Sequence, residues 1–272
     1  MSFYRVLLPA LFILQLAIPS HAARKPLIQS RTELQVDAPW SMVIAKGSKL
    51  DIKGVAGSIS VTRAPVGATT VTIERDAGAA VPRIELVTHD QGYTLCAIYP
   101  SQNPKKPNEC VPGGGGRMYQ GFKKGQPAVR FRVSVPEGVD ILGRLFDGDI
   151  SVDAGATNLD LEVITGRISI AASSAQYVQA TVGLTGDVEA SLIASPAKRS
   201  VSLSITNGTL RATIPKGRVF YNIQSRYRID TPFELEAGAI PENWMGELGD
   251  GGETLHLDLS SGYLGRIVLR GQ

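Results

Sequence analysis

One short phrase recurs along this chain of 272 residues: a glycine, a polar residue, and then an apolar, a polar and an apolar residue. It occurs at Gly57–Val61, Gly148–Val152 and Gly166–Ile170, with weaker copies that begin at Gly186 and Gly208. From Gly148 onward these glycines lie 18, 20 and 22 residues apart. Internal repetition at such a period is typical of stacked β-units, each of which buries its apolar face only against its neighbours.

The rest of the chain alternates between apolar and polar residues, with almost no helical periodicity. Clear examples are Val129–Val135, Leu159–Val163 and Leu255–Leu259. Successive side chains of a strand point to opposite faces, so each of these runs predicts a strand that is buried on one side. Because aromatic residues make up only 6% of the chain, we expect a core of Val, Ile, Leu and Ala.

These patterns predict an all-β fold, a β-solenoid or β-helix-like stack of short strands. Asp147–Gly148 and Asn207–Gly208 are strong signals for a tight turn, because both central residues of such a turn need a positive φ. Gly57, Gly166 and Gly186 occupy equivalent places in the repeat. Turns of this kind suit the corners of a solenoid and also antiparallel hairpins. A two-layer antiparallel β-sandwich is therefore the alternative.

Residues 1–22 predict a signal peptide that is cleaved near Ala22. Arg5 provides a positive start, Val6–Ile18 are mostly apolar, and small residues at Ser20 and Ala22 suit a signal peptidase. The apolar run is too short to span the ~30 Å of a bilayer core. We expect a periplasmic or secreted mature protein without a membrane span. In it, residues 23–44 form an N-terminal extension and residues 45–270 form one repetitive β domain.

The charge balance gives no support for nucleic-acid binding. The formal net charge is +3, and it falls to +2 when Arg5 is removed with the signal peptide. A nucleic-acid-binding surface needs clustered basic residues, which this near-neutral balance does not indicate. The remaining histidines, His89 and His256, have no spaced partners that would suggest a zinc site or a catalytic triad. We therefore expect no metal and no cofactor.

Cys96 and Cys110 are the only cysteines of the chain. Because an exported protein meets an oxidising compartment, we expect a disulfide that closes a 15-residue ring. Such a ring stabilises a fold by roughly 3 kcal/mol. The Cys-x-x-Cys spacing of a redox-active pair is absent.

The repeat is interrupted between residues 96 and 128, where prolines and Gly113–Gly116 replace the alternation. A long irregular segment that is tethered by a disulfide is a candidate for partner binding. The alternative is that it caps an open end of the stack, with Trp244–Glu247 as the cap of the other end. The candidate contact residues are Lys105, Lys106, Arg117, Tyr119, Phe122, Lys123 and Lys124.

The order of these parts resembles a family of bacterial exported proteins, the adhesin-like domains of unknown function. The resemblance is carried by the Gly57–Val61 phrase, the cysteine-bearing run Tyr93–Pro100, and Val135–Val139. The serial Gly-Asp-Ile motifs follow, and Gly251–Gly262 closes the pattern. The resemblance covers about residues 45–270 and implies an extended β-helix-like domain on envelope-associated proteins. It implies no catalytic residue.

Aspartates gather near the repeat glycines, at positions 147, 149, 153, 160 and 187. Polysaccharide-cleaving β-helix enzymes use paired carboxylates on one face, and Asp149 and Asp187, with Arg144 and Arg167 nearby, are the candidates for such a pair. The simpler explanation is that aspartate beside glycine stabilises a turn through a hydrogen bond to the backbone.

We therefore expect a non-enzymatic protein with a binding or structural role in the periplasm or cell envelope, whose partner is a protein or a glycan. A polysaccharide-active enzyme is the first alternative. A periplasmic sensor or assembly partner of an envelope complex is the second.

Overall fold

The structure is a computed structural model that describes residues 26–272 except 37–38, 65–68, 78–80, 102, 114–125, 154, 156–157, 196, 228, 239 and 250–253. Within these ranges the chain is all-β and forms one large mixed sheet. The strands are β1 (Ile28–Leu34), β2 (Trp40–Met42), β3 (Lys49–Lys53), β4 (Ala56–Arg63), β5 (Thr69–Arg75), β6 (Arg83–His89), β7 (Gly92–Ile98), β8 (Val129–Val135), β9 (Asp140–Asp153), β10 (Asn158–Ser173), β11 (Tyr177–Leu192), β12 (Arg199–Ile214), β13 (Arg218–Ser225), β14 (Ile229–Asp230), β15 (Asn243–Leu248) and β16 (Thr254–Gly271).

No helix capable of crossing a membrane is found in the part of the chain that the structure describes.

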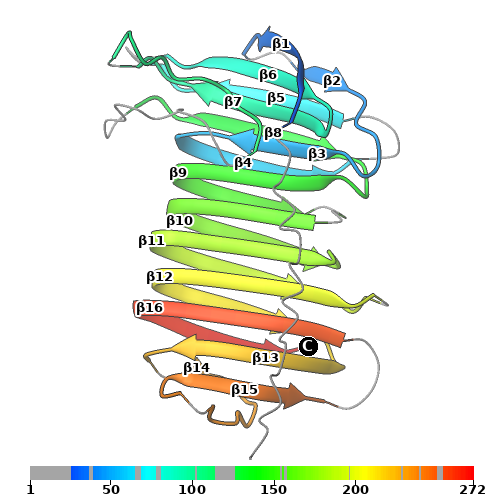
Figure 1. Cartoon of the computed structure of the whole chain (residues 1–272), viewed down its shortest axis with the longest axis vertical. Helices are drawn as coiled ribbons and strands as arrows, with labels where there is room; N and C mark the ends of the chain where they lie inside the picture. The colour runs from blue at the N-terminus through cyan, green and yellow to red at the C-terminus, as the bar shows by residue number, and fades with distance from the viewer. Residues whose placement is uncertain are drawn as a thin grey trace, which may run out of the picture.

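Five long strands form the body of the molecule. β9, β10, β11, β12 and β16 pair in parallel, each almost in register with the next, and they follow one another along the long axis in Figure 1. Each long strand spans one copy of the repeat or more, since β10 alone contains both Leu159–Val163 and the Gly166 phrase. The alternation of the sequence therefore predicted the strand segments, but not that two of them join into one bent strand.

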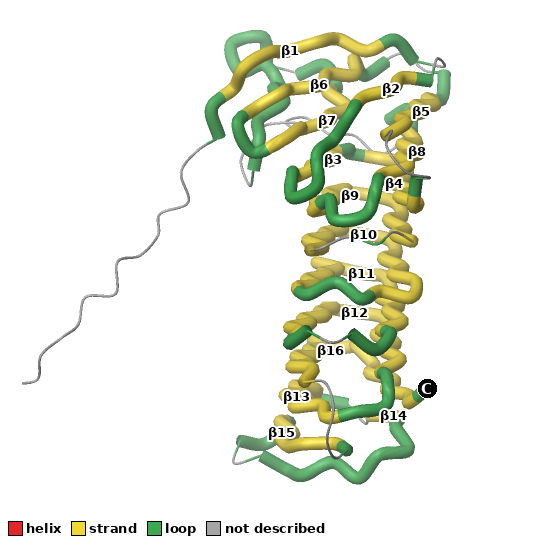
Figure 2. Tube along the Cα trace, turned by 90° about the vertical axis from the view of Figure 1, so that its right-hand side faces the viewer, coloured by secondary structure: helices red, strands yellow, loops and turns green. Residues whose placement is uncertain are grey.

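The two halves of the long strands lie in two layers, seen as two columns in Figure 2. The first half of β9 pairs with β3, which continues through β7 and β6 to the edge strand β1. The second half of β9 pairs with β4, which continues through β8 and β5 to β2. At the opposite end, β13 and β15 extend the first layer, whereas the second layer ends with the two-residue β14.

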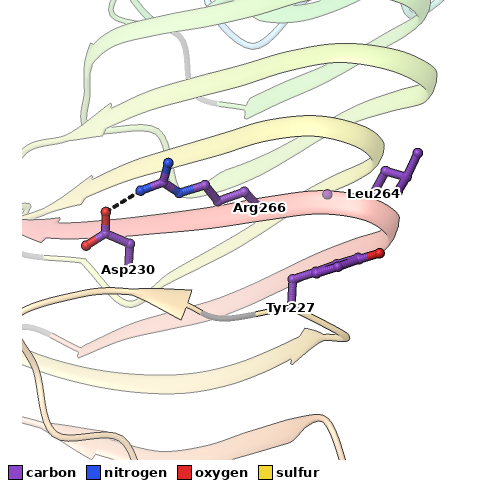
Figure 3. Close-up of a pocket in the computed structure, with 5 residues that line it drawn as sticks. Tyr227, Asp230, Leu264 and Arg266 are labelled. Atoms are coloured by element: carbon purple, nitrogen blue, oxygen red, sulfur yellow. Dashed lines mark hydrogen bonds and ion pairs between the residues drawn. The ribbon is translucent and has the colours of Figure 1, made fainter.

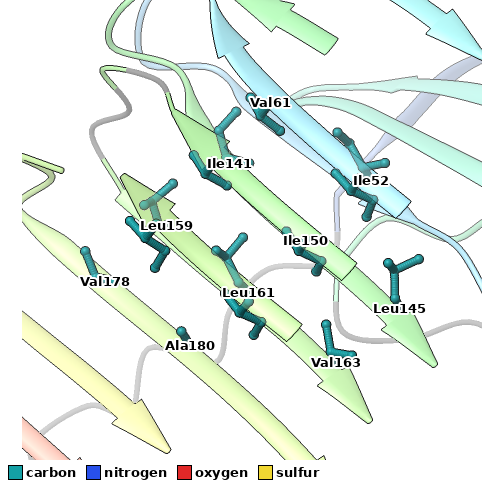
Figure 4. Packing of buried hydrophobic residues seen from close by; sticks show 14 of the residues in the cluster. Ile52, Val61, Ile141, Leu145, Ile150, Leu159, Leu161, Val163, Val178 and Ala180 are labelled. Carbon is teal, nitrogen blue, oxygen red and sulfur yellow. The ribbon is translucent and has the colours of Figure 1, made fainter. Parts of the chain in front are cut away.

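The core lies between the two layers and is built from aligned rows of aliphatic side chains (Figure 4). One row contains Ile141, Leu159, Val178 and Val201, all of them fully buried at 0% exposure. These residues are register partners in successive strands, so each side chain packs on the equivalent side chain of the next strand. The expected aliphatic core is confirmed, and Phe131 is the largest of the fully buried side chains.

The end of the body departs from sequence order. β16 lies between β12 and β13, although β13 comes before it in the chain. β15 pairs with β13 in an antiparallel arrangement. β16 is a single strand of 18 residues.

Candidate functional site

The repeat glycines form a ladder at the bends of the long strands. Gly57, Gly148, Gly166 and Gly186 are register partners in four neighbouring strands, and each has a positive φ between 126° and 149°. A Cβ atom on Gly166 would lie 1.9 Å from the carbonyl oxygen of Gly148. The chain therefore needs glycine at these positions both for the backbone conformation and for the close approach of the next strand.

Asp147–Gly148 and Asn207–Gly208 lie inside strands β9 and β12 instead of in two-residue hairpin loops. The strands on either side run parallel to them, so the chain bends at each glycine and continues into the second layer. The requirement for positive φ was inferred correctly, but a hairpin turn was not the only structure that meets it. These residues shape the bend.

Carboxylates at the bends bind the neighbouring strand. Asp149 Oδ1 accepts a hydrogen bond from the main-chain N–H of Arg167 at 3.1 Å, and Asp187 Oδ1 accepts one from Thr209 at 2.8 Å. Arg167 lies between the two aspartates in register and pairs with Asp187 at 3.8 Å. Two strand spacings, or ~10 Å, separate Asp149 from Asp187. The hydrogen bonds give both carboxylates a structural role.

The remaining residues considered for a catalytic carboxylate site lie in other places. Arg144 is in the first layer, where its guanidinium pairs with Asp160 at 3.1 Å and with the buried Asp51 at 3.6 Å. Asp147 and Asp153 lie at different points along β9. The five aspartates thus serve separate positions and are not assembled into one carboxylate site.

Cys96 and Cys110 are disulfide-bonded, with their Cα atoms 5.7 Å apart. Of the loop residues considered for partner binding, Lys105 and Lys106 are exposed. The others lie outside the described residues: Arg117, Tyr119, Phe122, Lys123 and Lys124.

The segment that follows Cys110 is held to the first layer by buried charges. Lys53 Nζ donates a hydrogen bond to the carbonyl of Val111 at 2.6 Å and another to that of Gly113. Asp51 accepts the main-chain N–H of Gly113 at 3.2 Å and pairs with Lys53 at 3.2 Å. Burial raises the pKa of Asp51 and lowers the pKa of Lys53. These contacts make the described part of the loop a cover over β3.

The bend of β16 differs from the regular bends. Gly262 and Tyr263 together oppose the single residue Thr206 of β12, so the bend contains one extra residue, a β-bulge. Gly265, the register partner of Gly208, does not have a positive φ. The side chains of Tyr263 and Leu264 are directed outward and are 70% and 68% exposed.

A pocket of about 560 Å³ lies beside this bend. It is lined by Tyr227, Asp230, Leu264, Gly265 and Arg266, and we call it the corner pocket. Figure 3 shows Asp230 and Arg266 paired at one end, with the ring of Tyr227 below the bend of β16. Its volume falls within the range of small-ligand sites.

Ion pairs fix the polar end of the corner pocket. Asp230 accepts a hydrogen bond from Arg266 at 2.6 Å and pairs with Arg270 at 3.1 Å. Hydrogen bonds from Arg270 and Arg266 lower the pKa of Asp230. An ionised carboxylate that is held by two arginines is poorly suited to act as a general acid.

Tyr263 precedes the lining residue Leu264 in the bend and contacts an arginine. The guanidinium carbon of Arg226 lies 4.5 Å from the centre of the Tyr263 ring, a cation–π contact. Arg226 is itself paired with Glu242 at 3.4 Å. The bend thus presents, next to the lining residue Leu264, an exposed aromatic ring that contacts an ion-paired arginine.

No residue of the corner pocket was identified from the sequence. Tyr227 and Asp230 lie after the last expected repeat, where no motif marks them. The bulge did leave a signal: Gly262 and Gly265 stand three residues apart, with two large apolar residues between them. Gly183–Leu184 in β11 is a related pattern, also bulged, and Leu184 is 55% exposed.

Among the described residues, no group of three or more His, Cys, Asp or Glu side chains is arranged to hold a metal ion.

No protein-family model and no curated protein matches the sequence. Among solved structures, the chain is similar to a "putative cell adhesion protein" from Clostridium sporogenes, with 12% identity and a TM-score of 0.49 over 86% of this chain and 99% of that one. It is also similar to a "putative adhesin" from Bacteroides fragilis, with 12% identity and a TM-score of 0.32 over 85% of this chain and 96% of that one. The function proposed below rests on the sequence and the geometry of this chain alone.

Proposed function

We propose that this protein is an exported, non-enzymatic binding protein of the periplasm or cell envelope. Its stacked body is a β-solenoid that serves as a scaffold, and the corner pocket is its binding site. A sensor or an assembly partner of an envelope complex would use the same site, because both roles begin with recognition of a ligand.

The observation that carries this proposal is the bulged bend of β16. The regular bends are closed by glycines and by carboxylates bound to the next strand. The bend of β16 instead exposes Tyr263 and Leu264 beside a pocket. Large exposed apolar side chains that gather around a concave site are typical of binding surfaces.

The chemistry of the site favours binding over catalysis. The carboxylate of Asp230 is engaged by Arg266 and Arg270, and hydrogen bonds from them lower its pKa. Glycoside hydrolysis needs a second carboxyl group at a defined separation and a raised pKa on one of the two. Among the described residues, the lining of the corner pocket contains one carboxylate, that of Asp230.

The N-terminal segment and the disulfide support the proposed site of action. Residues 1–22 have the pattern of a cleaved signal peptide. The Cys96–Cys110 bond suits an oxidising compartment such as the periplasm or the extracellular space. We further propose that the tethered loop contributes a second contact, through Lys105 and Lys106 and the residues that follow.

The test is a binding screen with residues 23–272 against arrays of glycans and of peptides. The variant Tyr227→Ser/Leu264→Ser removes the apolar lining, and Tyr177→Ser is the control because Tyr177 is an exposed tyrosine outside the corner pocket. We expect the first variant to lose the array signals and the control to keep them. Identical signals from all three proteins, or release of shortened products from the glycans, would refute the proposal.

A further inference from the structure

We propose that the corner pocket binds an acidic sugar of a glycan, which stacks on the tyrosine rings and places its carboxylate against Arg266. This inference rests on the proposed function and names its class of ligand. It is carried by three properties of the site: its aromatic rings, its net positive charge, and main-chain groups that are already paired or buried.

The rings match the apolar face of a sugar. Tyr227 is 46% exposed and Tyr263 is 70% exposed, so both offer ring surface to a ligand. A pyranose ring carries C–H groups on one face and hydroxyls around its rim. A tyrosine complements both, because it has an apolar body and a polar hydroxyl. Arg226 already packs against Tyr263, and this contact reduces the side-chain entropy that the ring loses on binding.

The charges favour an anionic ligand. Two arginines, Arg266 and Arg270, pair with the single carboxylate of Asp230 at the polar end of the pocket. These side chains together carry one excess positive charge. The side chain of Arg266 is 61% exposed, so N–H groups that do not contact Asp230 reach solvent. Guanidinium binds carboxylate through paired, charge-assisted hydrogen bonds.

The main chain at this edge disfavours the alternative ligand, a peptide strand added to the sheet. β14 already pairs with Ile267 and Val268 of β16. Arg270 donates hydrogen bonds to the carbonyls of Asp230 at 3.0 Å and of Leu269 at 3.2 Å, and Gly265 is buried. Strand addition needs a row of accessible main-chain groups. Recognition at this edge therefore depends on side chains, as it does for sugars.

Titration calorimetry with three defined probes tests the inference: tetragalacturonate as the acidic glycan, maltotetraose as the neutral glycan and tetraglutamate as the acidic peptide. We expect tetragalacturonate to bind most tightly. Tyr227→Ala and Tyr263→Ala should each weaken it about tenfold, since stacking of this kind is worth roughly a factor of ten. Tyr177→Ala should leave it unchanged. Arg266→Gln should abolish the preference for tetragalacturonate over maltotetraose, and Arg266→Lys should retain part of it.

Two calorimetric outcomes would overturn the inference and leave the proposed function standing: equal binding of maltotetraose and tetragalacturonate, or tighter binding of tetraglutamate that Tyr227→Ala weakens. Array ligands that depend on the corner pocket but contain no acidic sugar would do the same. The proposed function itself fails if no array ligand depends on Tyr227 and Leu264, or if the protein releases shortened products from the glycans.

Discussion

The bends of β10 and β16 occupy equivalent places in the stack but are built in different ways. At β10, Gly166 lies against Gly148, and Asp149 binds the main-chain N–H of Arg167. At β16, an extra residue pushes Tyr263 and Leu264 outward, and a pocket lies beside them. The first bend uses its residues to hold neighbouring strands together. The second bend places two large side chains at the surface beside a pocket.

The largest effect is expected where a regular bend loses its glycine. Gly166→Ala places a Cβ atom 1.9 Å from the oxygen of Gly148, at a φ of 137°. We expect a loss of about 4 kcal/mol or a failure to fold, because the strand must move away from its neighbour. Urea unfolding of residues 23–272 measures the loss.

The control for this variant is Gly47→Ala. Gly47 also has a positive φ, 83°, but a Cβ atom added there would meet no other atom within 4 Å. This variant suffers backbone strain alone and should lose about 1 kcal/mol. Equal losses at Gly166 and Gly47 would mean that contact between strands does not determine the choice of glycine.

The next effect concerns the disulfide between Cys96, in β7 of the first layer, and Cys110. Cys96→Ser/Cys110→Ser should lower the free energy of unfolding by about 3 kcal/mol, as expected for a ring of this size. The wild-type protein unfolded under reducing conditions should have the same midpoint as the variant. A variant as stable as the oxidised protein would show that Lys53 and Asp51 hold the segment without the disulfide.

Stability measurements on two variants should distinguish the two kinds of bend, with smaller losses than those above. Asp187→Ala removes the acceptor for the N–H of Thr209 and should cost about 1 kcal/mol. Asp187→Asn keeps an oxygen acceptor and should cost less. Tyr263→Ala should change stability by less than ~0.5 kcal/mol, because its side chain is mostly exposed. The comparison breaks down if Tyr263→Ala destabilises the protein more than Asp187→Ala does.

The smallest effect is a pH dependence that arises away from both bends. Burial lowers the pKa of His89 below 6.5, with a further contribution from Lys49, while Asp90 opposes the shift. The unfolded chain therefore binds a proton first as the pH falls below 6.5, and the folded state loses stability until the pH reaches the folded pKa. His89→Gln should make unfolding midpoints between about pH 7 and pH 5 less pH-dependent. An unchanged slope would contradict this.

The sequence contained enough information for the all-β class, the strand positions, the aliphatic core and the disulfide. Alternation specifies which face of a strand is buried, as in Leu159–Val163, and glycine specifies where positive φ is needed. Neither specifies the direction of the neighbouring strand. For this reason Asp147–Gly148 suggested a hairpin turn as readily as a bend between parallel strands.

The corner pocket was beyond such reasoning because its residues are assembled by topology. Tyr227 and Arg266 are brought together only because β16 lies between β12 and β13. No local pattern encodes that order. The aspartates suggested a shared carboxylate site for the opposite reason, because a local pattern was present. Their spacing follows the repeat, which places them in equivalent structural positions and not in one shared site.

The position of β16 also has a consequence for how the protein folds. In the described part of the chain, β13 pairs with β15 and with residues 254–261 of β16, but makes no ladder with β12. The antiparallel pair of β13 and β15 is therefore joined to the body only through β16, whether β16 pairs first with β12 or with β13. Assembly of the stack from its N-terminal side would then pause at β12 until the later segment arrives, and contacts of long sequence separation of this kind slow folding. The corner pocket would be among the last parts of the molecule to form.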